Sequence, residues 1–380
     1  MENISRKKFL TKGTAVLAGA SVFSALACGQ SESAKAVVSA QPSDPGKVYK
    51  WRMVTTWPPN FPILGEGCKQ MAQWVEKMSG GRLKIQVLGG GELVPAMESF
   101  DAVSSGTVEL GNGSAYYWAG KVPAAQFFST VPFGMNAQQM NAWILSGGGQ
   151  ALWDKVYEPF DVRGFPAGNT GVQMGGWFNK EINSLADLQG LKMRIPGLGG
   201  QVMKEAGVTA MNVAGGEIYT NLERGILDAT EWIGPFHDYK MGFQKIARYY
   251  YYPGWHEPGT TLETLVNKTK LESLPEDLQE ILISAIYRQN IWTLSELEAK
   301  NNEFMEKIIS EGEVEIRPFP AEVISRLREI TEQVLDKIAA EDPLAKEIYE
   351  SYSAFRISAQ KWAGYTEKIY YNQISGNTES

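Results

Sequence analysis

Histidine and cysteine are scarce in this chain. Its 380 residues include two histidines, His237 and His256, and two cysteines, Cys28 and Cys68. The histidines do not stand at metal-ligand spacing, and the G-x-S-x-G, C-x-x-C and Walker sequences are absent. These absences argue against the enzyme classes that depend on such motifs.

A complete dinucleotide-binding loop is also missing. The glycine-rich segment Pro196–Gly200 lies between a predicted strand and a predicted helix, where such a loop would stand. The fingerprint needs glycine at position 202, where this chain has Val202, and Pro196 removes a backbone N–H beside the turn. We interpret the segment as a tight strand-to-helix connection.

Blocks of basic residues are lacking as well. The net charge is −7 and no basic patch stands out, so nucleic acid is not an expected partner. Hydrophobic residues make up 43% and charged residues 21%, which is typical of a soluble globular protein, and the length favours two domains. An acidic protein that binds anions must rely on local donors, because its overall field repels them weakly.

The N-terminal region has the pattern of an export signal. Residues 5–10, Ser-Arg-Lys-Lys-Phe-Leu, resemble a twin-arginine signal with lysine in place of the second arginine, which leaves the twin-arginine and general export routes open. The apolar residues 13–27 are too few to cross a bilayer. We therefore predict a signal peptide over residues 1–27.

The two cysteines have different predicted roles. Cys28 is expected to be the lipidated first residue of a lipoprotein, although a lipobox normally has leucine where this chain has Ala25; simple cleavage after Ala27 is the alternative. The polar segment 28–46 is predicted to be a flexible tether. Cys68 is alone in the mature body, cannot form an internal disulfide, and is expected in the core.

Beyond the tether, predicted strands and helices alternate. We expect strands at Val48–Thr55, Arg82–Leu88, Leu110–Gly113, Phe127–Pro132 and Val162–Ala167, and helices at Ile63–Met78, Pro95–Ser104, Ala137–Leu145 and around Leu152–Tyr157. Such alternation predicts parallel α/β sheets, whose ligands lie beyond the carboxyl ends of strands or between domains. A much longer helix is predicted to start at Pro275, because no glycine or proline follows through Ser310.

Arg194 stands near the end of a short apolar run. The segment Leu191–Gly197 reads as a strand that ends in a Pro-Gly turn. An arginine at that place presents a planar, permanently charged fork to a carboxylate. A second distinctive segment, Asp228–Pro235, follows some three dozen residues later.

These segments resemble the signature of the solute-binding proteins of TRAP transporters, which capture organic acids outside the inner membrane. Two further segments, Gly215–Tyr219 and Tyr249–Gly259, are most similar to the branch that binds 2-oxo acids and lactate together with a cation. The resemblance covers essentially everything after residue 47.

The resemblance implies a two-lobed periplasmic binding protein of the α/β class, type II-like, with a long spine helix. It implies lobe 1 at residues 47–165 plus 255–300, lobe 2 at 166–254 plus 301–345, and a C-terminal helical extension at 346–380. The protein would have no catalytic residues. It would capture a small 2-oxo or 2-hydroxy monocarboxylate, similar to pyruvate or lactate, and deliver it to TRAP-type membrane permease subunits.

Two other functions stay open. A binding protein of another transporter class would take amino or sulfonic acids. An exported enzyme would act on a small hydroxy acid, but the absent catalytic histidine and cofactor motif disfavour it.

The resemblance also assigns a clamp and a cation site. Arg194 would grip the ligand's carboxylate, its ordinary alternative being a structural ion pair. Gln173 would offer an amide oxygen, Glu231 a carboxylate and Trp232 its backbone carbonyl to one cation. Such oxygen ligands suit Na⁺ or Ca²⁺. Judged alone, these three would be a loop residue, a strand-end carboxylate and a core aromatic.

Three further residues are candidates on weaker grounds. Glu257 follows an aromatic run and would join the cation site or serve a structural role between the lobes. Trp57 and Tyr117 follow predicted strands and would line the apolar side of the pocket, with the tyrosine hydroxyl bonding the ligand. Aromatic residues at such places are also common in cores and rims. Val172 stands beside Gln173 where other branches carry an arginine, which suggests a ligand with one carboxylate.

Apolar residues in the C-terminal tail recur at alternating spacings of four and three. The stripe consists of Ile348, Tyr352, Phe355, Ala359, Trp362, Thr366 and Ile369. It predicts either a helix packed on its own domain or a helix that joins two copies. The resembled branch forms dimers through C-terminal helices, so a homodimer is expected.

Overall fold

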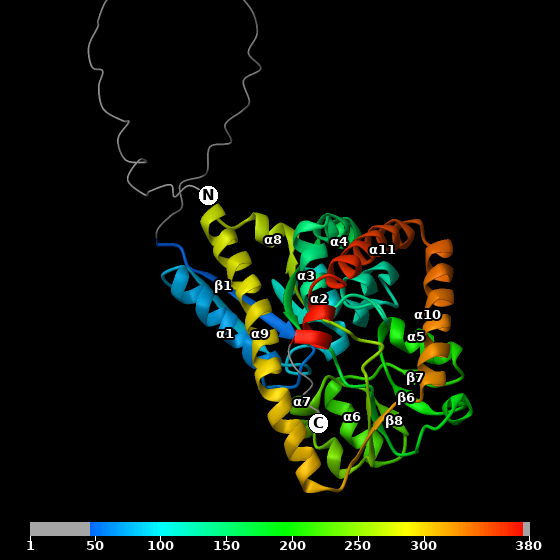
Figure 1. The fold of residues 1–380 in the computed structure, drawn as a ribbon. Helices are drawn as coiled ribbons and strands as arrows, with labels where there is room; N and C mark the ends of the chain where they lie inside the picture. Colours follow the sequence, from blue (N-terminus) through cyan, green and yellow to red (C-terminus); the bar gives the residue numbers. More distant parts are fainter. Residues whose placement is uncertain (1–45, 375–380) are drawn as a thin grey trace, which may run out of the picture. The chain divides into compact units, whose positions relative to one another are not determined.

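The computed structural model describes residues 46–374, whose strands form two sheets (Figure 1). The first has the order β2-β1-β3-β10-β4, with β1 at Tyr49–Thr55, β2 at Leu83–Leu88, β3 at Leu110–Gly113, β4 at Val162–Asn169 and β10 at Thr261–Asn267. The second has the order β11-β9-β5-β8-β6-β7, with β5 at Gly176–Phe178, β6 at Lys192–Arg194, β7 at Thr209–Met211, β8 at Ala229–Thr230, β9 at Tyr249–Tyr252 and β11 at Glu315–Pro318. The predicted signal peptide, Cys28 and nearly all of the predicted tether lie outside the described residues.

Both sheets mix parallel and antiparallel pairs. β1 is parallel to β2 and β3, and β6 is parallel to β7 and β8, as strand–helix alternation predicts. β10 is antiparallel to β3 and β4, and β5 is antiparallel to β8 and β9. Each of these two strands comes directly after the chain has crossed from one sheet to the other. No helical crossover precedes them, so the predicted parallel pairing holds for only part of each sheet.

The crossing between β4 and β5 lies beside the crossing between β9 and β10. Three main-chain hydrogen bonds join them: Thr170 N–H to Thr260 C=O (3.0 Å), Gln173 N–H to Glu257 C=O (3.1 Å) and Gly254 N–H to Gln173 C=O (3.0 Å). A fourth, from Gly175 N–H to Tyr251 C=O (2.7 Å), joins the first crossing to the end of β9. The two crossings therefore form a short paired ribbon between the sheets.

Helices connect the strands and cover the sheets. Their bounds are α1 Leu64–Met78, α2 Ser99–Ser104, α3 Ala137–Ser146, α4 Gly149–Tyr157, α5 Gly197–Glu205, α6 Gly215–Glu223, α7 Pro235–Met241, α8 Lys268–Glu272, α9 Glu276–Glu311, α10 Ala321–Glu341, α11 Pro343–Ala363 and α12 Glu367–Ile369. Short 3₁₀ segments include η3 at Ala115–Trp118 and η4 at Pro123–Phe128. No helix in the part of the chain that the structure describes combines the length and the apolar run needed to cross a membrane.

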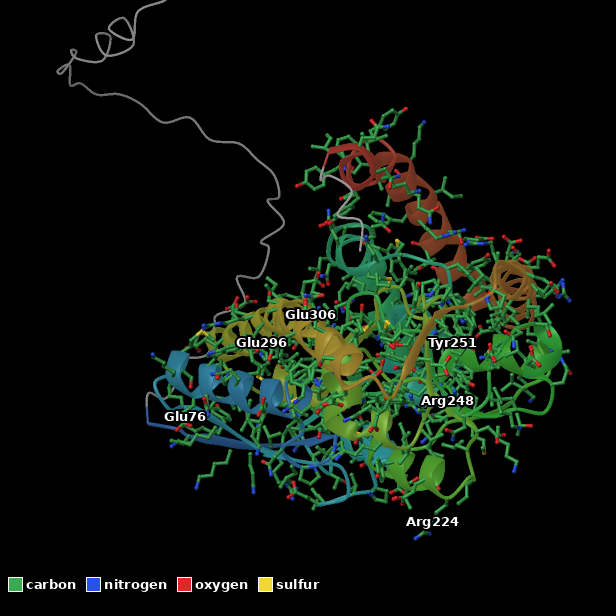
Figure 2. The ribbon with its side chains drawn as sticks, turned by 60° about the horizontal axis from the view of Figure 1, so that its bottom comes forward. Glu76, Arg224, Arg248, Tyr251, Glu296 and Glu306 are labelled. Carbon is green, nitrogen blue, oxygen red and sulfur yellow. The ribbon has the colours of Figure 1, made fainter. Side chains whose placement is uncertain are left out.

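The long helix α9 confirms the prediction made from Pro275. That proline is the N-cap, acidic residues occupy the first turn, and Gly312 ends the helix with a φ of 70°. α1 lies alongside α9, and in Figures 1 and 2 the two helices run next to each other. Cys68 of α1 is fully buried, and its thiol faces the Gln289 amide of α9 at 3.6 Å. This burial confirms the predicted core role and raises the pKa of Cys68 to about 12.

The strand predicted at Phe127–Pro132 is absent. Its first residues end the 3₁₀ helix η4, which begins at Pro123, and a loop follows. The ring of Phe128 stacks between those of Trp143 and Trp153, with centroids 5.5 and 5.0 Å away. A short apolar run indicates burial without distinguishing a strand from a helical turn, which explains the error.

The C-terminal stripe divides into a packed part and an exposed part. Ile348 and Tyr352 are buried against the body, where the Tyr352 hydroxyl accepts a hydrogen bond from the Met135 N–H at 2.8 Å. Near the end of α11, the side chain of Trp362 is 64% exposed. Packing on the chain's own body is thus confirmed for the first part of the stripe.

A buried carboxyl group in the first sheet predicts a pH dependence of stability. Glu263 of β10 is fully buried and accepts hydrogen bonds from Trp118 Nε1 and from the Tyr157 hydroxyl. Burial raises its pKa to about 8, above the ordinary value of 4.5, despite these two bonds. The folded protein therefore holds this proton more tightly than the unfolded chain does. The resulting stabilisation is complete below pH 4.5 and is lost as the pH rises through about 8.

We expect Glu263→Gln to be less sensitive to alkali than the wild type. The free energy of unfolding in urea should fall less between pH 5 and pH 8.5, because the amide does not ionise. Other buried carboxyls also titrate near neutrality, so the difference between variant and wild type isolates Glu263, and the exposed Glu76→Gln serves as the matched control. Identical pH slopes for Glu263→Gln and wild type would contradict the assignment.

Candidate functional site

Arg194 is the last residue of β6, and its side chain is only 1% exposed. Its guanidinium forms an ion pair with Glu231 and lies over the ring of Trp232, 5.1 Å from the centroid. Nε donates to the Val213 carbonyl at 3.3 Å, and Nη2 donates to the Tyr117 hydroxyl at 3.4 Å. Burial alone would lower the pKa of Arg194, but the Glu231 carboxylate together with Tyr117 and Tyr116 raises it above its ordinary value. The site therefore holds a permanent buried positive charge.

Glu231 follows β8 and completes the ion pair from the neighbouring strand. One carboxylate oxygen, Oε1, faces Arg194. The other, Oε2, is buried and has no hydrogen-bond partner among the described residues. Burial raises the pKa of Glu231 to about 7, while the arginine acts in the opposite direction. Glu231 Oε2 is thus available to a second positively charged group.

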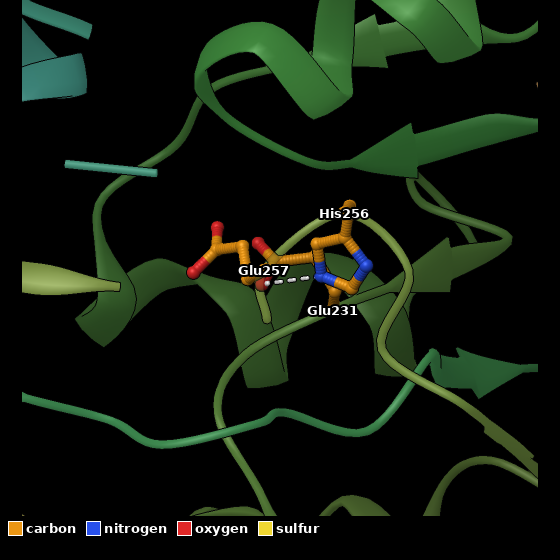
Figure 3. Close-up of side chains that lie close together, drawn as sticks. All are labelled: Glu231, His256 and Glu257. Carbon is orange, nitrogen blue, oxygen red and sulfur yellow. Dashed lines mark ion pairs between the residues drawn. The ribbon is translucent and has the colours of Figure 1, made fainter. Parts of the chain in front are cut away.

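Two residues of the connection that precedes β10, His256 and Glu257, lie close to Glu231 Oε2. His256 Nε2 lies 3.5 Å from Glu231 Oε2, and Figure 3 shows the imidazole facing that carboxylate. One ligand atom each from Glu231, His256 and Glu257 lies within 4.8 Å of the others. Burial lowers the pKa of His256 to about 4, so the ring is neutral. The pKa of Glu257 is raised to about 7 by burial and then by the negative charge of Glu231.

Gln173 lies on the paired ribbon next to this cluster. Its Nε2 donates to Glu257 Oε2 at 2.7 Å and to Thr170 Oγ1 at 3.2 Å. Its amide oxygen is buried and finds no partner within residues 46–374. Because Nε2 is fixed by its hydrogen bonds, the amide oxygen lies on the other branch of the amide and is available to another partner.

The donor set suits a hard cation. Gln173 Oε1 and Glu231 Oε2 are buried oxygens without partners in the described chain, and both nitrogens of His256 share that condition. A buried polar atom without a partner costs free energy, about 1–3 kcal/mol, unless a ligand or an ion completes it. A cation would also relieve the repulsion between the Glu231 and Glu257 carboxylates.

Two aromatic residues reach the same group from the first sheet. Trp57 follows β1, and its Nε1 donates to Asn112 Oδ1 at 2.6 Å. Its ring meets those of Tyr117 and Trp232 edge-on, with centroids 6.3 and 6.5 Å away. The hydrogen bond from Arg194 to Tyr117, which belongs to η3, links the sheets directly. The charged group therefore has one aromatic wall contributed by both sheets.

The structure brings every residue singled out from the sequence into one connected group: Trp57, Tyr117, Gln173, Arg194, Glu231, Trp232 and Glu257. Sequence reasoning missed His256, because its partners are distant in the chain and no spacing motif links them. Its position next to Glu257 was the available signal. A cavity of about 450 Å³ beside Arg163 and Lys268 shares no residue with this group.

Comparison with known proteins identifies the family. Residues 53–342 match the model of the bacterial extracellular solute-binding proteins, family 7. A protein of a Nostoc species, named a monocarboxylate 2-oxoacid-binding periplasmic protein, is 45% identical over 86% of this chain and 90% of its own length.

Solved structures agree with this assignment. A TRAP periplasmic solute-binding protein from Colwellia psychrerythraea, with bound calcium and pyruvate, is 43% identical and has a TM-score of 0.84; the match covers 86% of this chain and 99% of that one. A TRAP periplasmic solute-binding protein from Pseudoalteromonas atlantica, with bound sodium and pyruvate, is 42% identical, with the same TM-score and the same coverage. The predicted α/β binding-protein fold is confirmed. The chain belongs to the family 7 extracellular solute-binding proteins of TRAP transporters, which are periplasmic binding proteins and not enzymes.

Proposed function

We propose that this chain captures a small 2-oxo or 2-hydroxy monocarboxylate, similar to pyruvate or lactate, together with Na⁺ or Ca²⁺. The observation that carries the proposal is the buried Arg194–Glu231 pair, surrounded by polar atoms that lack partners in the described chain. Arg194 is the one cationic side chain among the residues that form the described group, which fits a ligand with one carboxylate. The ligands in the names of the similar proteins support the same class.

Capture would exchange the partners of the ion pair. The ligand's carboxylate takes the guanidinium fork of Arg194, for which Glu231 is the partner in the structure. Glu231 then turns to the cation, together with Gln173 Oε1, the Trp232 carbonyl and Glu257. The cation separates Glu231 from the ligand's carboxylate, which would otherwise repel each other in a dry site. The 2-oxo or 2-hydroxy oxygen gives the cation a second ligand atom from the bound acid.

The remaining residues shape the apolar side. Trp57 and Tyr117 would contact the carbon chain of the ligand, and the tyrosine hydroxyl would bond one of its oxygens. His256 would add a neutral nitrogen donor beside Glu231.

The two sheets would belong to lobes that close on the ligand. We assign residues 47–165 plus 255–300 to lobe 1 and residues 166–254 plus 301–345 to lobe 2. The boundary after residue 165 falls within β4, so the change of sheet itself comes a few residues later. TRAP binding proteins work with membrane permease subunits, which would receive the ligand from this chain.

A thermal-shift panel tests the function. Pyruvate, lactate, 2-oxobutyrate, taurine and an amino acid are compared with and without Na⁺ and Ca²⁺. A ligand that binds only the native state raises the melting temperature, by an amount equivalent to about 2.7 kcal/mol at a hundred times the dissociation constant. We expect a shift with the 2-oxo and 2-hydroxy acids that needs one of the cations. A shift with taurine or the amino acid alone would show that the ligand belongs to another class of organic acid.

Export and anchoring are the localisation part of the proposal. The first 27 residues would be removed as a signal peptide, and Cys28 would carry a lipid that holds the protein at the membrane. We expect Cys28→Ala to move the protein from the detergent phase to the aqueous phase in a detergent-partition assay. Equal partition of Cys28→Ala and wild type would indicate simple cleavage.

A homodimer through the C-terminal helix is the assembly part of the proposal. Several large apolar side chains near the end of the described chain are exposed: Ile357, Trp362, Tyr365 and Ile374. Apolar patches of this kind commonly mark contact surfaces. The earlier part of α11 is held to the body by Tyr352, so the exposed part is carried on a fixed base.

We expect the double variant Trp362→Glu, Tyr365→Glu to be monomeric in light scattering and to keep its affinity for the organic acid. Each substitution places a charge in the proposed contact, where burial without a partner is unfavourable. Ile226→Glu, at a similarly exposed apolar residue outside the tail, is the matched control and should leave the dimer intact. A wild-type chain that is monomeric at micromolar concentration would refute the assembly.

A further inference from the structure

A pocket of about 280 Å³, largely open to solvent, adjoins the group around Arg194. It lies between η3 and η4 on one side and α5 and β7 on the other. Much of its wall is apolar or small, including Ile195, Pro196, Ala210 and Met211. Its lining includes one charged side chain, Lys204, and no carboxylate among the described residues that line it. The volume is close to the lower end of ordinary small-molecule sites, roughly 300 Å³.

A pair of tyrosines separates this pocket from Arg194. Tyr117 lines the pocket, and its hydroxyl also accepts the hydrogen bond from Arg194 Nη2, so the partition is a single side chain thick. Tyr116 lines the same pocket and meets the Tyr117 ring edge-on, with centroids 4.8 Å apart. Burial raises the pKa of Tyr116 and the charge of Glu257 adds to the rise, as expected for a ring close to the charged group.

The Tyr116 ring is fixed against the start of α5. Gly197 has a φ of +61°, and a Cβ atom there would stand 2.9 Å from Tyr116 Cβ. Gln201 Nε2 donates to Gln126 Oε1 at 3.0 Å and joins the two sides of the pocket. The Tyr116 side chain is therefore packed between η3 and the start of α5 and has little freedom to change its position.

We propose that Tyr116 sets the upper length of the acids that this protein accepts, and that the pocket behind it is a potential compartment for a longer acyl chain. The inference rests on the proposed function. A carboxylate held by Arg194 and a 2-oxo oxygen held by the cation leave the rest of the carbon chain to point away from both. A single tyrosine ring separates the apolar pocket from Arg194. No carboxylate of the described chain lines the pocket to repel a bound organic anion.

Calorimetry with pyruvate and 2-oxohexanoate, in buffer with both Na⁺ and Ca²⁺, tests the inference. We expect Tyr116→Ala to change the ratio of the two affinities at least tenfold in favour of 2-oxohexanoate. 2-Oxohexanoate has three more carbon atoms than pyruvate. Burial of each methylene increases affinity by about fourfold at most, so burial of all three would exceed the tenfold change in the ratio. Tyr116→Phe should behave like wild type, because the ring remains. Tyr219→Ala, on α6 and away from the pocket, is the matched control.

A second variant separates the pocket from a general loosening of the site. In Tyr116→Ala, the additional change Ala210→Phe fills the compartment and should restore the wild-type ratio. Tyr116→Leu replaces the ring by a smaller apolar group, and it tests the same point if the alanine variant does not fold. Unchanged ratios in folded Tyr116→Ala and Tyr116→Leu would overturn the inference alone. A wild-type protein that binds neither acid with either cation would overturn the proposed function and this inference together.

Discussion

Arg194→Lys should bind its organic acid roughly 10 to 150 times more weakly than the wild type. Lysine keeps the charge but loses the planar fork, and a charge-assisted hydrogen bond of this kind contributes about 1.5–3 kcal/mol. The guanidinium already uses separate nitrogens for Val213, Glu231 and Tyr117, a geometry that a single ammonium group cannot reproduce. Titration calorimetry of the variant measures the loss.

The control is a surface arginine. Arg248→Lys makes the same chemical change at a side chain that is largely exposed and paired with Glu315, so its affinity should equal that of the wild type. Wild-type affinity in Arg194→Lys for every acid that binds would show that the clamp lies elsewhere.

Glu231→Gln and Gln173→Ala should each abolish the cation dependence of ligand binding while the fold persists. Each change removes one hard oxygen ligand or its charge, and hard cations bind weakly when the coordination shell is opened. In Glu231→Gln the bound carboxylate also loses its charged bridge to the protein. The measurement compares ligand affinity in replete buffer with affinity in chelated, sodium-free buffer.

Removing the two ions separately identifies which one is used. Glu76→Gln, an exposed carboxylate on α1, provides the control and should keep the wild-type response. Equal affinity of the wild-type protein in replete and ion-free buffers would refute the shared cation, whatever the variants do.

Several features could be predicted because they depend on neighbours in the sequence. The long helix α9 follows from an uninterrupted segment with a proline start, and Leu110–Gly113 is a strand within the bounds predicted for it. The position of Arg194 follows from the rule that ligands lie beyond strand ends. The family resemblance added the grouping of residues that local patterns would have left as loop, core and strand-end positions.

Other features depend on contacts between distant segments and had no local signal. His256 joins Glu231 only because β8 and the connection before β10 meet in space. The antiparallel direction of β10 depends on where the chain crosses between the sheets. Phe128 lies in a stack of rings from α3 and α4, which no periodicity of its own segment reveals. The roles of the site residues stay predictions for the experiments above.

The paired ribbon between the sheets has a mechanical consequence. Gln173 and Glu257 belong to opposite sides of it and are joined by both main-chain and side-chain hydrogen bonds. A cation held by these two residues would link both connections, so any bending of the ribbon would disturb the coordination shell. Loading the ion should therefore stiffen the joint itself, and amide hydrogen exchange at residues 170–175 and 251–260 should slow when the ion binds, even before an organic acid is added.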